Sequence, residues 1–271
     1  MLAAVTTGVA VPIRTLPAGG RFAWRLVQRN LVTGRRQWLL IVSGFFEPVF
    51  FLLGLGIGVG KLVGDVEFAG GLVPYREFVA PALLAAAAMN GAVYESTINV
   101  FAKLKWGKVY EGVLATPLGV RDVALGELTY ALMRGGIYAG GFVVVMAALG
   151  LIGSPWAAAA IPAALLIGAA FAAVGLVAVT VMRSWADFGF MEVVTLPLFL
   201  FSATFVPLHE YPQAVQWILP LTPLYHGVEL LRGLTLGEIG TGLLVHVGYL
   251  AAMTVAGLAV ADRRLGRLLL K

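Results

Sequence analysis

Six long apolar runs alternate with shorter polar segments along the 271-residue chain. A helix that crosses the hydrocarbon core of a bilayer needs about 20 apolar residues. The runs are continuous and rich in Ala, Leu and Gly, whereas the strands of a membrane barrel alternate apolar and polar residues. We therefore predict an all-α integral membrane protein with six transmembrane helices, over residues 38–60, 78–100, 128–152, 157–182, 188–206 and 239–261.

The composition excludes the main soluble classes of protein. Hydrophobic residues make up 60% of the chain, and only 12% of the residues are charged. So few charged side chains cannot cover the surface of a soluble protein of this length, which excludes a soluble enzyme and a disordered linker. The chain has no cysteine, so disulfides, thiolate catalysis and cysteine-ligated metal sites are excluded as well.

Lys and Arg are distributed unevenly between the two sides of the predicted spans. Fifteen of the 19 basic residues fall on the side of both termini, three on the other side, and Arg134 lies inside a span. Because cytoplasmic loops carry the excess of Lys and Arg, both termini are predicted to be cytoplasmic. No basic cluster with interleaved aromatic residues lies on a soluble module, so no nucleic-acid partner is expected. The predicted parts are a cytoplasmic N-terminus (1–37), a six-span transmembrane domain (38–261) and a basic cytoplasmic tail (262–271).

The segment from Gly20 to Trp38 has the pattern of an amphipathic helix. Apolar residues share one helical face and arginines the other, namely Ala23, Leu26, Val27 and Leu31 against Arg21, Arg25, Arg29 and Arg36. We predict that this helix lies in the inner membrane interface, with Phe22 and Trp24 at the acyl boundary. The alternative is a solvated basic tail.

Two predicted cytoplasmic loops differ in length. Residues 101–127 form the longer loop, in which apolar and charged residues interleave as in a short amphipathic helix that ends before Gly119. The other loop, Arg183 to Asp187, is so short that a soluble partner must press against the membrane face. On the outer side, residues 206–238 are apolar but interrupted by four prolines, so we predict short re-entrant helices between spans five and six.

Three glutamates and one arginine fall inside the predicted spans, where a charge is costly. Glu47 lies near the bilayer centre, where it either faces a wet pathway or a partner, or stays protonated. Glu95, Arg134 and Glu192 share a depth of about 8 Å from the inner ends of their spans, by helical rise. Because spans two and three are antiparallel neighbours, we predict a Glu95–Arg134 pair, with Glu192 as competitor or third member. The alternative is that Arg134 snorkels independently to the interface.

Two patterns resemble known sites but lack required residues. The glycines over residues 54–61 resemble a phosphate-binding loop, yet Walker A requires Gly where Leu55 stands and Ser or Thr where Leu62 stands. Their spacing suits close helix packing instead. His226 and Glu229 have the spacing of a helical metal pair, but no further ligand completes a site. We predict no catalytic residue and no metal site.

Several motifs along the chain resemble those of one transporter family. They are the amphipathic segment Gly20 to Trp38, the loop motif Lys108 to Leu118 followed by Gly126-Glu127, and the block from Phe205-Val206-Pro207-Leu208 through Pro220-Leu221-Thr222-Pro223 to Glu229, Leu231-Arg232 and Leu236-Gly237. The last block is the most specific, and the matches extend over nearly the whole chain. The chain resembles the permeases of ATP-binding-cassette type-2 exporters, particularly the nodulation-factor and daunorubicin-resistance branch.

The resemblance implies a transporter subunit that is not itself an enzyme. Such permeases have six spans, form dimers and bind two separate ATPase subunits from the cytoplasm. The implied partners are two ATP-binding-cassette ATPase subunits, a second permease (an identical copy or a paralogue) and membrane lipid; ATP and Mg belong to the ATPase, and this chain carries no cofactor. Residues 103–114 resemble the coupling helix that fits a groove on the ATPase, with Arg183 to Asp187 as a second contact. The implied coupling residues are Lys103, Trp106, Gly107, Lys108, Tyr110, Glu111, Arg183 and Trp185.

The resemblance also implies a substrate path along the dimer interface near spans one, two and five. The residues that this places near substrate are Phe46, Glu47, Asn90, Tyr94, Phe199 and Thr204. We expect an ATP-driven exporter in a bacterial cell (inner) membrane that moves an amphipathic or hydrophobic substrate, such as a drug, a lipid or a lipid-linked saccharide. Two alternatives stay open: a proton-coupled secondary multidrug exporter that uses Glu47 or the charge layer as a relay, and a membrane scaffold without transport.

Overall fold

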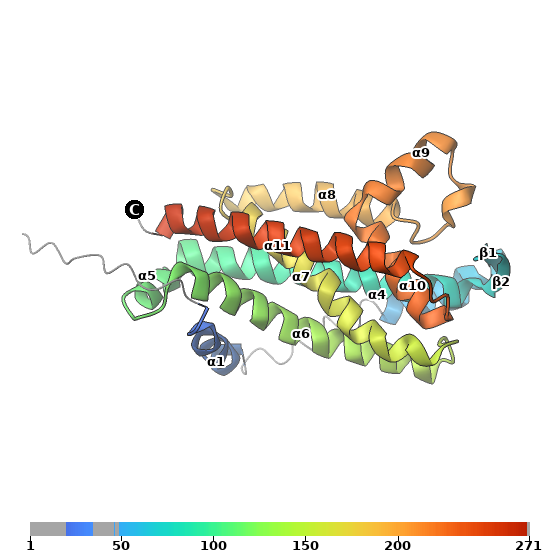
Figure 1. Cartoon of the computed structure of the whole chain (residues 1–271), viewed down its shortest axis with the longest axis horizontal. Coiled ribbons are helices and arrows are strands. Elements are labelled where there is room, and N and C mark those ends of the chain that lie inside the picture. Colours follow the sequence, from blue (N-terminus) through green and yellow to red (C-terminus); the bar gives the residue numbers. More distant parts are fainter. Residues whose placement is uncertain (1–19, 35–45, 47–48, 270–271) are drawn as a thin grey trace, which may run out of the picture.

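The computed structural model describes residues 20–34, 46 and 49–269, and they form a bundle of long helices (Figure 1). Within these residues, four helices are long and apolar enough to cross a membrane: Tyr75–Trp106, Val120–Ala148, Pro155–Val179 and Gly242–Leu269. They correspond to predicted spans two, three, four and six. The first predicted span appears in part, as the shorter apolar helix Val49–Val63. The fifth appears as a helix of 12 residues, Gly189–Leu200. Six complete spans therefore remain a prediction.

The elements follow one another in a simple order. The first half holds α1 (Ala23–Gly34), the π-helix η2 (Leu52–Val59), α3 (Gly60–Val63), β1 (Asp65–Phe68), β2 (Gly71–Pro74), α4 (Tyr75–Tyr94), the π-helices η3 (Glu95–Asn99) and η4 (Ala102–Trp106), α5 (Val109–Leu114) and α6 (Val120–Ala148). The second half holds η5 (Pro155–Ala159), α7 (Ala160–Val179), η6 (Trp185–Phe188), α8 (Gly189–Leu200), η7 (Leu208–Glu210), α9 (Gln213–Ile218), η8 (Leu219–Leu221), α10 (Pro223–Leu236) and α11 (Gly242–Leu269).

Helix α7 lies at the centre of the bundle, packed against α4, α6 and α11. Small residues allow this close packing, because a Cβ built on Gly257 of α11 would lie 2.8 Å from the Cβ of Ala173. A Cβ on Gly175 would likewise overlap Ser96 of η3. Helices in lipid associate mainly through such close backbone approach, so the Ala- and Gly-rich composition of α7 explains its central place.

The helices extend beyond the apolar runs that predicted them. Helix α6 begins at Val120, directly after an extended Gly119 whose N–H donates to the Asp122 carboxylate (2.9 Å). The helix that begins with α4 continues at its C-terminal end to Trp106. The loop predicted over residues 101–127 is therefore much shorter than expected. Helix α11 likewise continues to Leu269, through much of the region predicted as a basic tail. Backbone hydrogen bonding continues after the side chains become polar, and caps and turns set where a helix ends.

The described residues are mostly helical, which is consistent with the predicted all-α class, and a small antiparallel hairpin, β1–β2, is an addition that was not predicted. The turn between the strands has positive φ at Ala69 (51°) and Gly70 (79°), as the type I′ turns of two-residue hairpins require. The hairpin lies at one end of the bundle, which we call the hairpin end, and α5 lies at the other (Figure 1).

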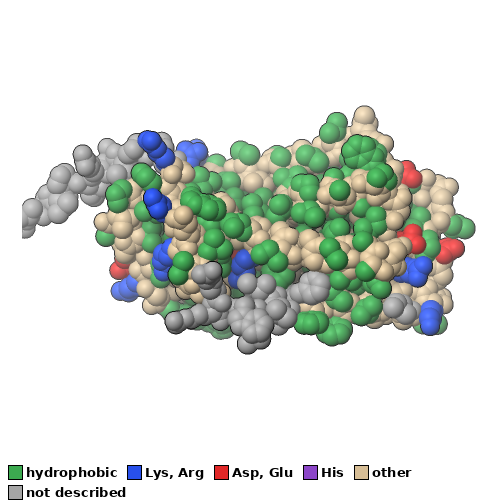
Figure 2. Space-filling model, turned by 90° about the horizontal axis from the view of Figure 1, so that it is seen from below, with side chains coloured by type: hydrophobic (Ala, Val, Ile, Leu, Met, Phe, Trp, Pro, Cys, Tyr) green, Lys and Arg blue, Asp and Glu red, His purple; other side chains and the backbone are tan. Residues whose placement is uncertain are grey.

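Basic residues mark the end that carries α5, which we call the basic end. Lys and Arg side chains gather toward this end of the visible face, and acidic side chains gather toward the hairpin end (Figure 2). Lys105, Lys108, Arg121 and Arg183 lie at or beside η4, α5, the start of α6 and η6. The basic residues that the sequence placed on one side of the predicted spans therefore also gather at one end of the folded bundle.

Helix α1 packs on α6 through the face that was predicted to enter the membrane. Leu26 and Val27 are buried, and Leu26 lies over Gly126, which has no side chain to keep α1 away. Protein therefore covers the middle of the apolar face, while Leu31 remains exposed. Phe22 and Trp24 remain exposed, so these two aromatic rings are available for contact with lipid.

Short helices fill residues 206–238, as the prolines predicted. Among them α10 is deeply buried and packs against α4, α7 and α11, whereas α9 has no buried residue. Their entry into the outer leaflet stays a prediction.

Candidate functional site

The two segments predicted to contact an ATPase meet at the basic end. The indole rings of Trp106, which ends η4, and Trp185, which begins η6, stack with centroids 5.4 Å apart and 25° between their planes. Phe101 and Phe188 pack edge to face at 5.1 Å and touch the two indoles from the protein side. Trp106 is 66% exposed and Trp185 is 55% exposed. We call these four side chains the tryptophan surface.

Helix α5 is separate from η4, which corrects the single helix predicted over residues 103–114. The break is at Lys108, whose backbone is left-handed (φ 44°), so the preceding helix cannot run on into α5. Lys108 and Glu111 follow Trp106 closely in the sequence, and both are exposed. Tyr110 and Val113 are buried. One side of α5 therefore faces outward and the other faces the bundle.

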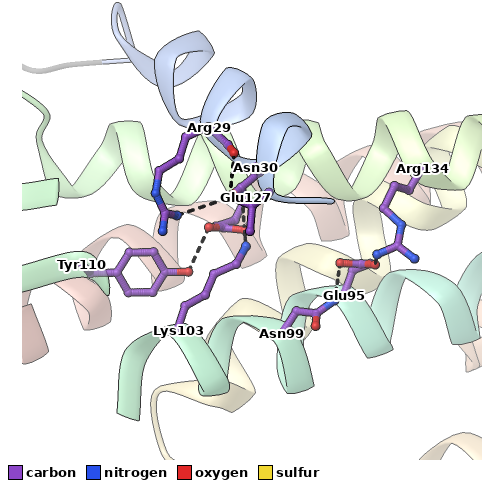
Figure 3. A network of polar contacts seen from close by, with 9 residues as sticks. Arg29, Asn30, Glu95, Asn99, Lys103, Tyr110, Glu127 and Arg134 are labelled. Carbon is purple, nitrogen blue, oxygen red and sulfur yellow. Dashed lines mark hydrogen bonds and ion pairs between the residues drawn. The ribbon is translucent and has the colours of Figure 1, made fainter. Parts of the chain in front are cut away.

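Glu127 of α6 receives hydrogen bonds from three other elements (Figure 3). Its Oε2 accepts from Lys103 Nζ of η4 at 2.6 Å and from Asn30 Nδ2 of α1 at 3.2 Å, and its Oε1 accepts from Tyr110 Oη of α5 at 3.0 Å. Burial, and then the Glu127 carboxylate, raise the pKa of the Tyr110 hydroxyl well above its usual range, so this hydroxyl stays protonated and donates. We call Glu127 and these three partners the Glu127 network.

Two of the predicted coupling residues are members of the Glu127 network. Lys103 and Tyr110 were expected to touch the ATPase, but both point into the bundle, and Tyr110 is only 1% exposed. Glu127 was missed as a site residue because it fell at the end of a predicted loop. Its partners lie 17, 24 and 97 residues away in the sequence, so no local sequence pattern indicated these contacts.

The predicted layer of buried charges is partly assembled. Glu95 forms an ion pair with Arg134, and Asn99 Nδ2 donates to the second oxygen of Glu95 at 2.6 Å (Figure 3). Arg134 also donates to Tyr138 Oη at 3.2 Å, while its Nε has no hydrogen-bond partner among the described residues. Glu192 is exposed on α8, and it takes part in no ion pair within the described part of the chain.

The residues predicted to line a substrate path lie in different surroundings. Asn90 and Tyr94 are exposed one turn apart on α4. Phe199 packs edge to face on Phe51, with ring centroids 6.3 Å apart. Thr204 is completely buried, so it faces no open path in this conformation. Phe46 stacks on Phe50 at 5.8 Å, and the adjacent Glu47 lies outside the described residues.

The histidine–glutamate motif is divided between two separate contacts. His226 Nδ1 lies 2.8 Å from His246 Nδ1 of α11, whereas Glu229 binds Arg232. Within the described ranges, no three His, Asp or Glu side chains are grouped so that they would hold a metal ion.

The contact between α1 and α6 gives a first testable prediction. A Cβ on Gly126 would lie 2.9 Å from Leu26 and 3.0 Å from the carbonyl oxygen of Ala23. We expect Gly126→Ala to push α1 outward and to lower the free energy of unfolding by about 1–3 kcal/mol, the usual cost of overpacking. Gly112→Ala is the control, because a Cβ on Gly112 of α5 meets nothing within 4 Å. Equal unfolding midpoints for the two variants would contradict this packing.

The bundle of apolar helices and its charged, aromatic end define a multi-pass membrane protein. Residues 21–236 match the model of the family described as ABC-2 type transporter, and the chain belongs to that family. It is similar to Nodulation protein J of Rhizobium leguminosarum bv. viciae, with 32% identity over 264 residues that cover 96% of this chain and 99% of the relative. The Nodulation protein J of R. leguminosarum bv. trifolii is 33% identical (96% and 98% covered), and that of Rhizobium meliloti (strain 1021) is 30% identical (95% and 98%). The chain is therefore the membrane subunit of a transporter.

Proposed function

We propose that this chain is the permease of an ATP-driven exporter and that a separate ATPase binds at its basic end. The contact of Trp106 with Trp185 carries this proposal, because it joins two segments that are far apart in the sequence into one surface. Large exposed aromatic side chains are enriched at the centres of protein interfaces, where a partner covers them. The proposed contacts on this surface are Trp106, Gly107, Lys108, Glu111, Arg183 and Trp185.

The work of transport comes from nucleotide on the partner. ATP and Mg bind the two ATPase subunits, whose closure shifts α5 and changes the permease pair between two conformations. The second permease is a copy of this chain or a paralogue. The excess of Lys and Arg supports a cytoplasmic location for the basic end in a bacterial inner membrane, with both termini on that side.

The substrate that we propose is amphipathic or hydrophobic. The exposed side chains of η2 and α8 are mostly apolar and partly aromatic, although α8 also exposes Glu192, and Asn90 and Tyr94 are exposed polar groups on α4. This lining suits a drug, a lipid or a lipid-linked saccharide. A proton relay through Glu95 is less well supported, because Arg134 and Asn99 already engage both of its oxygens. Of the other two carboxylates of that alternative, Glu192 is exposed on α8 and Glu47 lies outside the described residues.

The test is the double variant Trp106→Ala with Trp185→Ala. We expect the ATPase to bind this variant at least about 30-fold more weakly, since truncation of an interface hot spot costs about 2 kcal/mol or more. ATP-driven transport into sealed vesicles should fall accordingly. Trp217→Ala is the matched control, because Trp217 on α9 is exposed (75%) far from the basic end. If the double variant and the control bind the ATPase equally well, the tryptophan surface is not the docking site.

A further inference from the structure

Helix α5 is too short to hold its own position. It has six residues, and isolated helices shorter than about 12 residues are unstable in water. Its orientation therefore depends on tertiary contacts, and the two side chains that it buries are Tyr110 and Val113. Tyr110 makes the polar contact, through the hydroxyl that donates to Glu127.

The same carboxylate holds α1. Asn30, which is buried, donates to Glu127 from the middle of α1. The start of α1 is fixed one turn earlier on α6, where Asp122 Oδ1 accepts the N–H groups of Gly20 (2.8 Å) and Phe22 (2.9 Å). Two acidic residues near the beginning of α6 therefore hold α1 at two points, and one of them also holds α5.

Lys103 connects the C-terminal end of the helix that begins with α4 to Glu127. Its ammonium is bound to Glu127 at 2.6 Å and lies 5.6 Å from the centre of the Tyr130 ring. Lys103 precedes Trp106 by three residues on η4, so one short helix carries a member of the Glu127 network and a member of the tryptophan surface. A displacement of η4 therefore acts directly on the Lys103–Glu127 contact.

We propose that Glu127 is a positioning residue that makes α1 and α5 move as one unit with the basic end of α6. This inference rests on the proposed function, since the ATPase supplies the push on α5. Glu127 does not touch the ATPase or the substrate. It acts by transmitting the displacement of α5 to α1, where Trp24 and the preceding Phe22 are exposed and can reach the lipid interface.

The network stabilises an acidic residue at a buried place. A carboxylate is costly to bury unless it is fully paired, and the oxygens of Glu127 have three donors from three elements. Glu127→Gln keeps the size of the side chain but removes the charge that Lys103 neutralises and replaces one acceptor oxygen by a donor. Tyr110→Phe is milder, because it removes only the hydroxyl that connects α5.

Distance measurements between spin labels in the complete permease–ATPase complex test the proposal. The chain has no native cysteine, so labels can be placed at Val32→Cys on α1, Gly112→Cys on α5 and Arg264→Cys on α11. All three positions are exposed. On ATP binding we expect the α1–α5 distance to stay constant while both labels move relative to α11.

In Glu127→Gln and in Tyr110→Phe, we expect α5 to move without α1. The amount of substrate moved per ATP hydrolysed should then fall by at least about fivefold, the lower range of coupling between sites. A merely structural role would lower the unfolding midpoint without separating the two movements. Glu238→Gln, an exposed change at the hairpin end, is the control for charge removal.

The possible failures are distinguishable. If the α1–α5 distance changes on ATP binding in the unaltered protein, or if both variants keep full coupling, the role of Glu127 is refuted. If α5 of the unaltered protein does not move at all when the ATPase binds ATP, the proposed function itself is refuted. Tyr110→Phe keeps the test valid if Glu127→Gln fails to fold, because it leaves the Glu127–Lys103 pair in place.

Discussion

Replacement of Arg232 by methionine is expected to destabilise the folded chain by about 3–5 kcal/mol, the usual cost of removing one partner of a buried ion pair. Arg232 is 1% exposed and donates to Glu229 Oε1 (2.6 Å), the carbonyl oxygen of Ala203 (2.9 Å) and that of Phe78 (3.3 Å). Its guanidinium also lies 3.7 Å from the centre of the Phe78 ring. Methionine fills much of the volume but leaves one carboxylate and two carbonyl groups without their donor.

The measurement is the free energy of unfolding in mixed micelles. Arg76→Met is the control, since Arg76 is exposed at the same end of the bundle. Arg232→Lys should fall between the two, because lysine keeps the charge but lacks the planar fork that reaches several acceptors. Equal stability of Arg232→Met and Arg76→Met would contradict a structural role for the buried guanidinium.

The second large effect is expected at the Glu95–Arg134 pair, which joins η3 to α6. Glu95→Gln and Arg134→Gln each leave a buried charge without its partner, so we expect each to cost about 3 kcal/mol or more. The double variant should cost less than the sum of the two, by about 0.5–3 kcal/mol, because the residues are in direct contact.

The control for this double-mutant cycle is the pair Glu192→Gln and Arg134→Gln. Glu192 lies at a similar predicted depth, but the structure leaves it exposed on α8. We expect strict additivity for this pair. Additivity for Glu95 and Arg134 as well would mean that the ion pair contributes nothing to folding.

Hydropathy predicted where the chain crosses an apolar layer but not where its helices end. The apolar runs identified α4, α6, α7 and α11 correctly, because a long uncharged helix has few alternatives in lipid. Helix α6 begins earlier than predicted because Gly119 and Asp122 cap it. Helix α8 ends at Leu200, with Pro197 inside its last turn, so a run of apolar residues overstated its length. The hairpin was missed because its strands have only four residues each.

The sequence predicted contacts of the site only for residues at the same depth in the membrane or in loops on the same side of it. Equal depth was enough to bring Glu95 and Arg134 together, and the loop assignment placed Trp106 and Trp185 on the same side of the membrane. Their stacking required the packing of η4 against η6, which no local pattern contains. The Glu127 network was not predictable for the same reason, since its members come from four elements.

The hairpin joins the hairpin end of the first apolar helix to the start of α4. Tyr75 N donates to the carbonyl oxygen of Gly64 at 3.1 Å across the base of the hairpin, and a Cβ on Gly56 would lie 3.5 Å from Arg76. Because so short a connection leaves little slack between α3 and α4, any change in the angle between these two helices has its pivot beside β1–β2.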